Sequence, residues 1–262
     1  MTTTRPAPID TDELLRQVTD MYRAVAETPH ERFHFETGRA LAERLGYPPD
    51  ELDQVPSEAI DSFAGVGYHL DLAHLQQGER VLDLGSGSGM DAFVASLAVG
   101  PQGQVVGLDM TDAQLAKAER LRSEHGLEHV TFQHGHIEQL PFDDASFDAV
   151  VSNGVINLAP DKPRVFAEAA RVLRPGGRLA IADIVTDEPL TEAIVCDVDL
   201  WASCIGGAPQ EQTYREAMAG AGFRVEVTKT NPYRFLSEQA INASERFGVH
   251  SVSVLATKPD RT

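Results

Sequence analysis

The sequence predicts an α/β protein in which a doubly wound parallel sheet follows a helical cap. Two observations predict it. From Arg80 onwards, short apolar runs alternate with amphipathic segments, as in strands joined by crossover helices. Before Arg80, apolar residues recur at helical spacing between prolines. We therefore expect a disordered tail at residues 1–8, a helical cap at 9–78 and a sheet domain at 79–262.

Three helices are expected in the cap. The first spans Asp10 to about Glu27, where apolar side chains form one face, and Pro29 ends it. The second spans Thr37–Leu45, and a glycine follows it. A third, short helix is expected after Ser57, whose hydroxyl would serve as its N-cap.

The strands and helices of the sheet domain are predicted from apolar and amphipathic segments that alternate along the sequence. The expected strands are RVLDL, QVVGLD, HVTFQHG, FDAVVSN and GRLAIADIV. The expected helices between them are DAFVASLAV, DAQLAKAERLRSEHG and VFAEAARVLRPGG, the last closed by Pro175-Gly176-Gly177. The chain then continues with a helix at Glu211–Ala221 and strands near Phe223–Val227 and at His250–Thr257.

Composition restricts the possible partners. The formal net charge of −18 repels phosphate backbones and anionic lipids, so neither nucleic acid nor a membrane is expected as a partner. No signal peptide and no apolar run of transmembrane length is recognised. Cys196 and Cys204 are the only cysteines, which implies no disulfide framework. We expect a cytoplasmic protein, and the sequence does not indicate its oligomeric state.

A glycine-rich loop follows the first strand, in the stretch VLDLGSGSGMD. Gly85, Gly87 and Gly89 stand where a strand passes into its helix, which is where open α/β sheets bind ligands. Glycines there let a ligand lie against bare backbone. The spacing is not the dinucleotide fingerprint G-x-G-x-x-G, because Met90 occupies its third glycine position.

Carboxylates around this loop indicate the kind of ligand. Asp91 at the start of the helix would repel a pyrophosphate, and Asp83 adds a second negative charge. Both would attract a ligand with a cationic amino-acid end. Asp109 ends the second strand, where an acid suits the two hydroxyls of a ribose.

In combination, these motifs resemble the class I S-adenosylmethionine-dependent methyltransferases over about residues 78–185. The similarity is carried by VLDLGSGSG, VVGLD, HGHIEQLPFDDASFDAVVSN and EAARVLRPGGRL. It implies a Rossmann-like, seven-stranded sheet with a reversed last strand, in the place of His250–Thr257. It also implies S-adenosylmethionine as the cofactor and an insertion at about 186–210 on the substrate side.

The resemblance also implies a cofactor-binding set. The glycine loop with Ser86 would border the methionine part, and Asp83 would lie near its amino group. Asp109 would bind the ribose and Met110 would pack on the adenine. His136 and Ile137 would flank the adenine edge, and Asn153 would lie beside the sulfonium.

A closer resemblance, to the arsenite methyltransferase branch, extends to about residue 208. It is carried by SEAIDSFAGVGYHLDLAHLQQGERVLDL, GLDMTDAQL, SNGVINLAPDKPRVFAEAARVLRPGG and LWASCIGGA. That branch binds trivalent arsenic through thiolates, in motifs that typically read G-C-G and S-N-C-V-I-N-L. This chain has Val66 and Gly154 at those cysteine positions, and only Cys204 remains. Cys196 would lie about 12 Å from it along a helix axis, too far to share one arsenic atom.

The ligand set therefore favours a small organic acceptor over arsenic. His69 and His34 are the candidate bases and Tyr68 is a candidate orienting group, although the stretch Phe33-His34-Phe35 also suits a packed cap. No metal site is expected. One alternative is an arsenite or methylarsenite methyltransferase that uses Cys204 with external thiols. Another is a non-catalytic S-adenosylmethionine-binding protein. A nicotinamide-dependent oxidoreductase is disfavoured by Met90 and Asp91.

Overall fold

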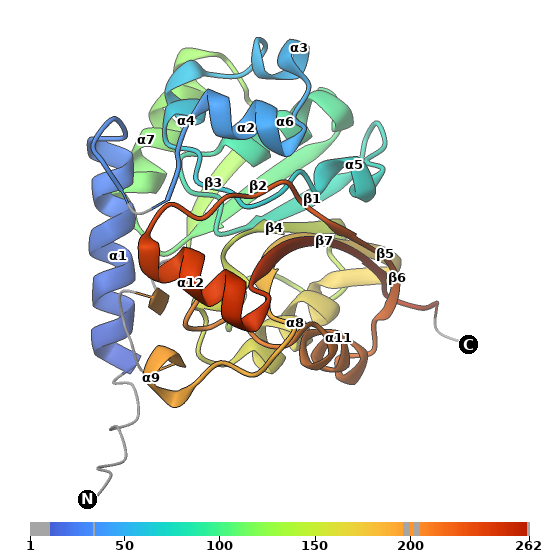
Figure 1. The fold of residues 1–262 in the computed structure, drawn as a ribbon. Coiled ribbons are helices and arrows are strands. Elements are labelled where there is room, and N and C mark those ends of the chain that lie inside the picture. The colour runs from blue at the N-terminus through green and yellow to red at the C-terminus, as the bar shows by residue number, and fades with distance from the viewer. Residues whose placement is uncertain (1–10, 34, 196–199, 202–204, 261–262) are drawn as a thin grey trace, which may run out of the picture.

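The computed structural model describes residues 11–33, 35–195, 200–201 and 205–260. Figure 1 shows helices on both faces of a central sheet. The tail predicted at residues 1–8 lies outside the described residues. Within the described part, no helix is long and apolar enough to cross a membrane.

The sheet has seven strands in the order β3-β2-β1-β4-β5-β7-β6. They are β1 (Arg80–Leu84), β2 (Gln104–Asp109), β3 (Val130–His134), β4 (Phe147–Asn153), β5 (Leu173–Val185), β6 (Arg224–Thr230) and β7 (His250–Thr257). All neighbours pair in parallel except β7, which is antiparallel to both β5 and β6. This confirms the predicted doubly wound sheet with its reversed last strand.

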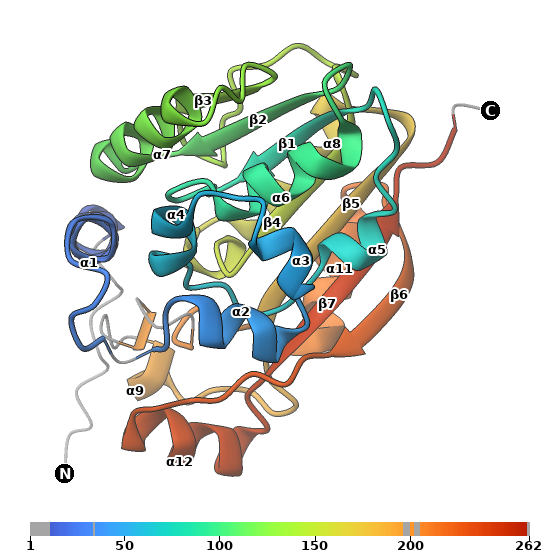
Figure 2. The same cartoon turned by 90° about the horizontal axis from the view of Figure 1, so that it is seen from above.

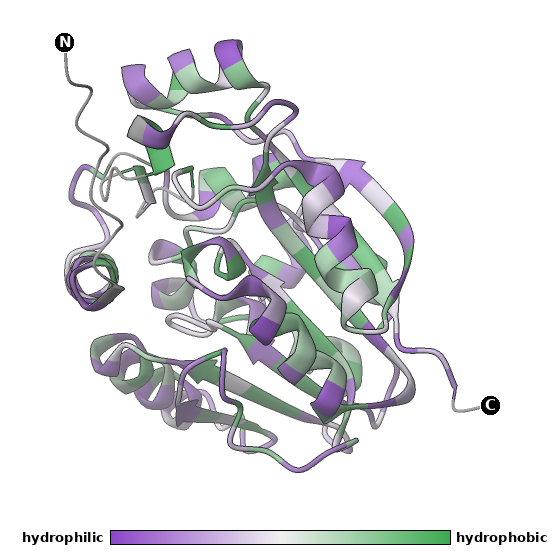
Figure 3. Cartoon of the chain, turned by 90° about the horizontal axis from the view of Figure 1, so that it is seen from below, coloured by the Kyte–Doolittle hydropathy of each residue, from purple (hydrophilic) through white to green (hydrophobic). Residues whose placement is uncertain are grey.

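Alternating side chains of the strands make two apolar layers. Val81 packs with Phe93 and Leu121, from the helices α6 (Met90–Val99) and α7 (Asp112–Glu124), on one face of the sheet. Leu82 points to the other face, where it shares a core with α8 (Lys162–Val172) and α11 (Glu211–Gly220). In Figure 3, hydrophobic residues lie along the central strands between these two helical layers.

The N-terminal helices pack on the α6 side of the sheet. The short helices are α2 (Arg39–Leu45), α3 (Pro49–Leu52), α4 (Ser57–Asp61) and α5 (Leu70–Ala73). The long helix α1 (Thr11–Glu27) stands apart from them beside α7, and Figure 2 shows it end-on. The remaining elements are η1 (Ile156–Leu158), α9 (Glu192–Val195) and α12 (Glu238–Phe247).

Three details of the predicted elements were wrong. Ser57 is the first residue of α4 rather than its cap: Pro56 occupies the N-cap, and no side chain caps this end. Pro175-Gly176-Gly177 does not close a helix, because Leu173 is already extended and β5 begins there. The sequence reading also missed α12, whose Ser237 side chain accepts a hydrogen bond from the Ala240 amide and caps the helix.

The strand order creates a crevice at the carboxyl end of β1. Leu84 is paired with Leu108 of β2 on one side and with Ser152 of β4 on the other. The connections that leave β1 and β4 lead to opposite faces, which opens a ligand-binding crevice between them. Asp83, Asp109 and Asn153 are therefore carried to the edge of one crevice by three neighbouring strands.

Candidate active site

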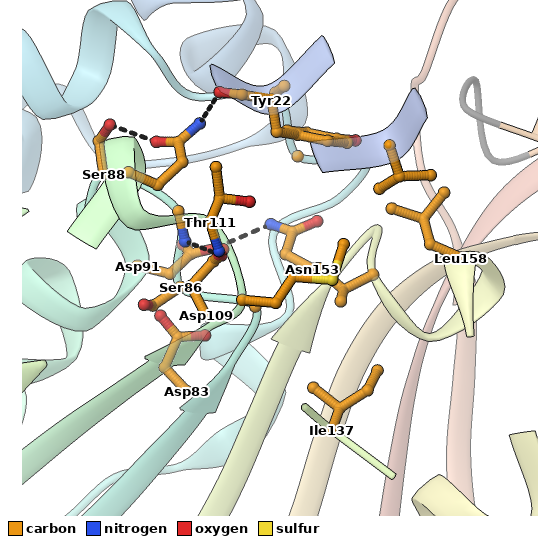
Figure 4. A pocket seen from close by; sticks show the side chains of 18 of the residues that line it. Tyr22, Asp83, Ser86, Ser88, Asp91, Asp109, Thr111, Ile137, Asn153 and Leu158 are labelled. Atoms are coloured by element: carbon orange, nitrogen blue, oxygen red, sulfur yellow. Dashed lines mark hydrogen bonds between the residues drawn. The ribbon is translucent and has the colours of Figure 1, made fainter. Parts of the chain in front are cut away.

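A pocket occupies this crevice, and α1 covers it. Most residues of the predicted cofactor set line it, namely Asp83, Gly85, Ser86, Gly87, Asp109, Met110, His136, Ile137 and Asn153. Figure 4 shows several of these side chains, with Tyr22 of α1 and Leu158 of η1 on the opposite wall. Gly89 does not line the pocket, so its placement does not support the predicted contact with a ligand.

The glycine loop needs two of its glycines for space as well as for backbone conformation. Gly85 has φ +70°, and a Cβ there would lie 2.5 Å from Cγ1 of Val155. Gly89 has φ +93°, and its Cβ would lie 2.7 Å from the ring of Phe132. The first glycine keeps the pocket floor open, whereas the second lets α6 start against the core.

Asp109 fixes the shape of the loop from the end of β2. One carboxylate oxygen accepts a hydrogen bond from the Gly87 amide (2.9 Å), and the other accepts one from the Thr111 amide (2.8 Å). Burial raises the pKa of Asp109, and these backbone donors oppose that rise. Asp109 also lines the pocket, as the ribose prediction requires.

Asp83 leaves polar atoms for a ligand. Its carboxylate is 1 % exposed, and its Oδ2, like Oγ of Ser86, has no hydrogen-bond partner among the described residues. Burial raises the pKa of Asp83 well above its ordinary value, and the charges of Asp91 and Asp109 raise it further. No lysine or arginine is among the described residues that line the pocket. Buried acids without a counter-charge suit a ligand that brings a positive charge.

Asn153 organises the wall next to the glycine loop. Its Oδ1 accepts hydrogen bonds from the amides of Val66 (2.8 Å) and Gly67 (3.3 Å). Its Nδ2 donates to the Gly67 carbonyl (2.9 Å), to Oδ2 of Asp91 (3.0 Å) and to the hydroxyl of Tyr47 (3.1 Å). That hydroxyl in turn donates to Oδ1 of Asp91. Asp91 is thus held by two donors, and the segment that carries Val66 is tied to β4.

The two positions that lack the arsenite-branch cysteines adjoin each other. A Cβ built on Gly154 would lie 3.4 Å from Cγ1 of Val66. Val66 is 2 % exposed and belongs to an apolar cluster with Leu158 and Trp201. Neither Val66 nor Gly154 lines the pocket, but their chain neighbours Gly65, Asn153 and Val155 do. A valine side chain and bare backbone thus stand beside the pocket, where the arsenite branch has thiolates. Cys196 and Cys204 lie outside the described residues, and the described part holds no group of three side chains able to bind a metal ion.

Two of the predicted catalytic residues, Tyr68 and His69, lie outside the pocket. Tyr68 does not line the pocket, and its hydroxyl donates to Glu51 (3.3 Å). His69 is fully buried, and neither ring nitrogen makes a hydrogen bond of good geometry with the described residues. Burial lowers the pKa of His69, although the nearby charge of Asp91 acts in the opposite direction. The lowered pKa favours the neutral ring. These positions do not favour catalytic roles for either residue, and His34 lies outside the described residues.

The sequence reading missed the residues that α1 and α7 contribute. Leu15, Val18 and Tyr22 of α1 line the pocket, and so does Gln114 of α7. The helical spacing of the first three predicted that α1 has an apolar face. Nothing in the sequence indicated that this face would cover a ligand pocket rather than the core.

The family model described as "Methyltransferase domain" matches residues 75–237. The chain is 40 % identical over 230 residues to an arsenite methyltransferase of Halobacterium salinarum, covering 86 % of this chain and 58 % of that protein. It is 36 % identical to the arsenite methyltransferase of Mus musculus, covering 76 % of this chain and 55 % of the relative. The chain therefore spans a little over half the length of these curated relatives.

Solved structures show the same fold. An arsenic(III) S-adenosylmethionine methyltransferase from Chlamydomonas reinhardtii superposes with a TM-score of 0.65 at 31 % identity, covering 85 % of this chain and 74 % of that one. A geranyl diphosphate C-methyltransferase from Streptomyces coelicolor, in complex with S-adenosyl-L-homocysteine, gives a TM-score of 0.68. It covers 97 % of this chain and 99 % of that one, but at 17 % identity it supports the fold alone.

Proposed function

The chain belongs to the S-adenosylmethionine-dependent methyltransferase family, and from this we propose that it transfers a methyl group from S-adenosylmethionine to a small organic molecule. The bound donor supplies an electrophilic methyl group on a cationic sulfonium. The charge of −18 supports action in the cytoplasm without a nucleic-acid or membrane partner.

The pocket fits the donor by charge and by shape. The unpartnered Asp83 oxygen can accept a hydrogen bond from the ammonium of the methionine part. The glycine loop lets that part lie against backbone, and Asp109 presents its carboxylate to the ribose hydroxyls. One buried acid would thus face the methionine part of the donor, and the acid at the end of β2 would face its ribose. Together, the two acids support a single orientation of this ligand in the pocket.

The acceptor side supports an organic substrate. The observation that carries this proposal is the contact between position 154 and Val66, where a glycine and a valine stand in place of two thiols. The apolar cluster to which Val66 belongs reaches the pocket through Val18 and Leu158. Such side chains bind an organic molecule by burying its surface, and trivalent arsenic gains nothing from them. The chain's main task is then to hold the nucleophilic atom about 3–3.5 Å from the methyl carbon.

A second candidate is supported by the comparisons. The two curated relatives described above, at 40 % and 36 % identity, are named arsenite methyltransferases, and the first match covers 86 % of this chain. In this case Cys204 and external thiols would have to hold the arsenic. A Cys204→Ser variant would then lose turnover, whereas an organic substrate predicts that its turnover persists.

The proposed function is tested with a methyl-labelled donor. Purified protein is incubated with labelled S-adenosylmethionine and a panel of apolar phenols, amines and thiols, and both S-adenosylhomocysteine and labelled products are quantified. We expect label in at least one organic product, with equimolar S-adenosylhomocysteine. Donor binding without any turnover would instead indicate a non-catalytic S-adenosylmethionine-binding protein.

A further inference from the structure

The helix α1 forms one wall of the pocket without belonging to the sheet domain's layers. It presents Leu15, Val18 and Tyr22 to the pocket, while Leu14 and Val25 are buried against other parts of the molecule. Figures 1 and 2 show α1 at the edge of the molecule, beside α7. A ligand in the pocket would therefore be covered by a helix that lies outside the layers of the sheet domain. Only contacts with neighbouring elements hold this helix in place.

One of these contacts connects α1 to the glycine loop through a single side chain. The Ser88 hydroxyl donates to Oε1 of Gln114 (2.5 Å), and Nε2 of Gln114 donates to the backbone carbonyl of Tyr22 (2.8 Å). Figure 4 draws both hydrogen bonds. Ser88 is 4 % exposed and Gln114 is 2 % exposed, so water does not compete for either bond.

A separate contact holds the end of α1 independently of the loop. The Lys117 ammonium donates to the Ala26 carbonyl (3.0 Å) and to the Ser62 hydroxyl (2.9 Å). That hydroxyl donates to the Val25 carbonyl (2.9 Å). These carbonyls lie in the last turn of α1, where a helix has no internal donors left and favours a positive charge. Ser62 lines the pocket but Lys117 does not, so the lysine can be changed without removing a group that faces a ligand.

We propose that Gln114 is a positioning residue that couples the glycine loop to α1, so that a donor seated on the loop holds α1 closed over itself. This inference rests on the proposed function, because it needs the donor in the pocket. The donor fixes the loop backbone around Ser88, and the Ser88 hydroxyl then fixes the Gln114 carboxamide. With its oxygen engaged, the carboxamide directs one N–H at the Tyr22 carbonyl. Closure of α1 would exclude water from the reacting centre.

The test is hydrogen exchange of the α1 amides, with and without S-adenosylhomocysteine. In the wild-type protein we expect the ligand to slow exchange over residues 11–27 by at least tenfold. Gln114→Met keeps the volume of the side chain but removes both hydrogen bonds, and Ser88→Ala removes the loop end alone. Both variants should lose most of the ligand-dependent slowing and release the ligand about tenfold faster. Because they break one connection, the double variant should add little to either.

Lys117→Met is the matched control. It removes the attachment at the end of α1, so exchange should be faster both with and without ligand, while the ligand-dependent slowing persists. Unchanged ligand-dependent slowing in Gln114→Met and Ser88→Ala would overturn the proposal, as would variants that speed exchange equally in both states. Calorimetry on the same samples separates the two claims. A wild-type protein that fails to bind S-adenosylhomocysteine contradicts the proposed function, whereas binding without slower exchange contradicts only the coupling.

Discussion

Asp83 is the residue whose chemistry depends most on what fills the pocket. In the free protein its pKa is raised by burial and by the neighbouring acids, so the protonated form is favoured. An ammonium group beside Asp83 would favour the carboxylate instead. Donor binding should therefore release a proton and tighten as the pH rises from the ordinary carboxyl range to the raised pKa of Asp83.

The stability of the free protein changes with pH in the opposite direction to donor affinity. A carboxyl group whose pKa is higher in the folded than in the unfolded chain makes the free protein less stable as the pH rises through that interval. The thermal stabilisation given by donor should consequently grow with pH. Calorimetry in buffers of different ionisation enthalpy would detect the released proton. An Asp83→Asn variant should bind the donor at least tenfold more weakly and release no proton, and equal proton release in both proteins would contradict the assignment.

The second prediction for individual residues concerns Val66 and Gly154. Because a Cβ at position 154 would touch Val66, the double variant Val66→Cys/Gly154→Cys should place two sulfur atoms within reach of one arsenic atom. We expect arsenite to bind this variant at least tenfold more tightly than it binds the wild-type protein, as measured by equilibrium dialysis. Val66→Cys alone is the control and should give a much smaller gain. An equal gain in both variants would show that the two positions do not cooperate.

At the scale of elements, the turn from β1 to α6 offers a matched pair of glycines. Gly85 and Gly87 both have positive φ, but only Gly85 is closely packed, against Val155. At Gly87 a Cβ would lie 3.7 Å from the nearest side-chain atom. Gly87→Ala should therefore cost about 1 kcal/mol of unfolding free energy, from backbone strain alone. Gly85→Ala should cost at least about 2 kcal/mol, because a clash is added.

Chemical denaturation of both variants measures this difference. The variant Gly85→Ala/Val155→Ala should recover part of the loss, since the second change removes the atoms that would collide. Equal costs for Gly85→Ala and Gly87→Ala would mean that packing at Gly85 is looser than described.

The elements also show which parts of the site the sequence could predict. Asp83, Asp109 and Asn153 were placed correctly at strand ends because strand patterns and the turns that follow them are local signals. Gln114 was not singled out, since its importance comes from contacts with Ser88 and Tyr22 that are remote in the chain. A surface-like position in an amphipathic helix gives no sign of such contacts.

The positions of Tyr68 and His69 could not be predicted for a related reason. Tyr68 and His69 closely follow Val66 in the sequence, and this proximity suggested that they lie around the substrate pocket. The structure turns that segment at Gly67, where a Cβ would lie 2.8 Å from the Ala182 side chain, and sends His69 into the interior. The direction of a short loop depends on such packing, which no periodicity reveals.

At the scale of the whole molecule, Arg178 joins the sheet to the segment that precedes β1. Arg178 of β5 donates to both carboxylate oxygens of Glu79 (3.0 and 2.6 Å) and to the Ala73 carbonyl (2.7 Å) at the end of α5. The side chains are only 19 % and 10 % exposed. Arg178→Met should therefore cost about 3 kcal/mol of unfolding free energy, because Glu79 is left buried without its partner.

An exposed pair serves as the control for that measurement. Arg224 and Glu226 lie 2.8 Å apart with side chains 72 % and 34 % exposed. Arg224→Met should change the unfolding free energy by less than about 0.5 kcal/mol. Similar losses in the two variants would show that burial does not strengthen the Arg178–Glu79 pair.

The central claim is that this chain has a methyl-donor site but lacks the paired thiols of the arsenite branch beside it. One reaction tests this claim most directly. Purified protein is incubated with S-adenosylmethionine, arsenite and glutathione, donor binding is verified in the same sample, and methylated arsenic is quantified by element-specific mass detection. Since valine and glycine occupy the two thiol positions, we predict that the donor binds and that no methylarsenic accumulates. Methylarsenic formed over several turnovers would contradict the organic acceptor and assign the arsenic chemistry to Cys204 with external thiols.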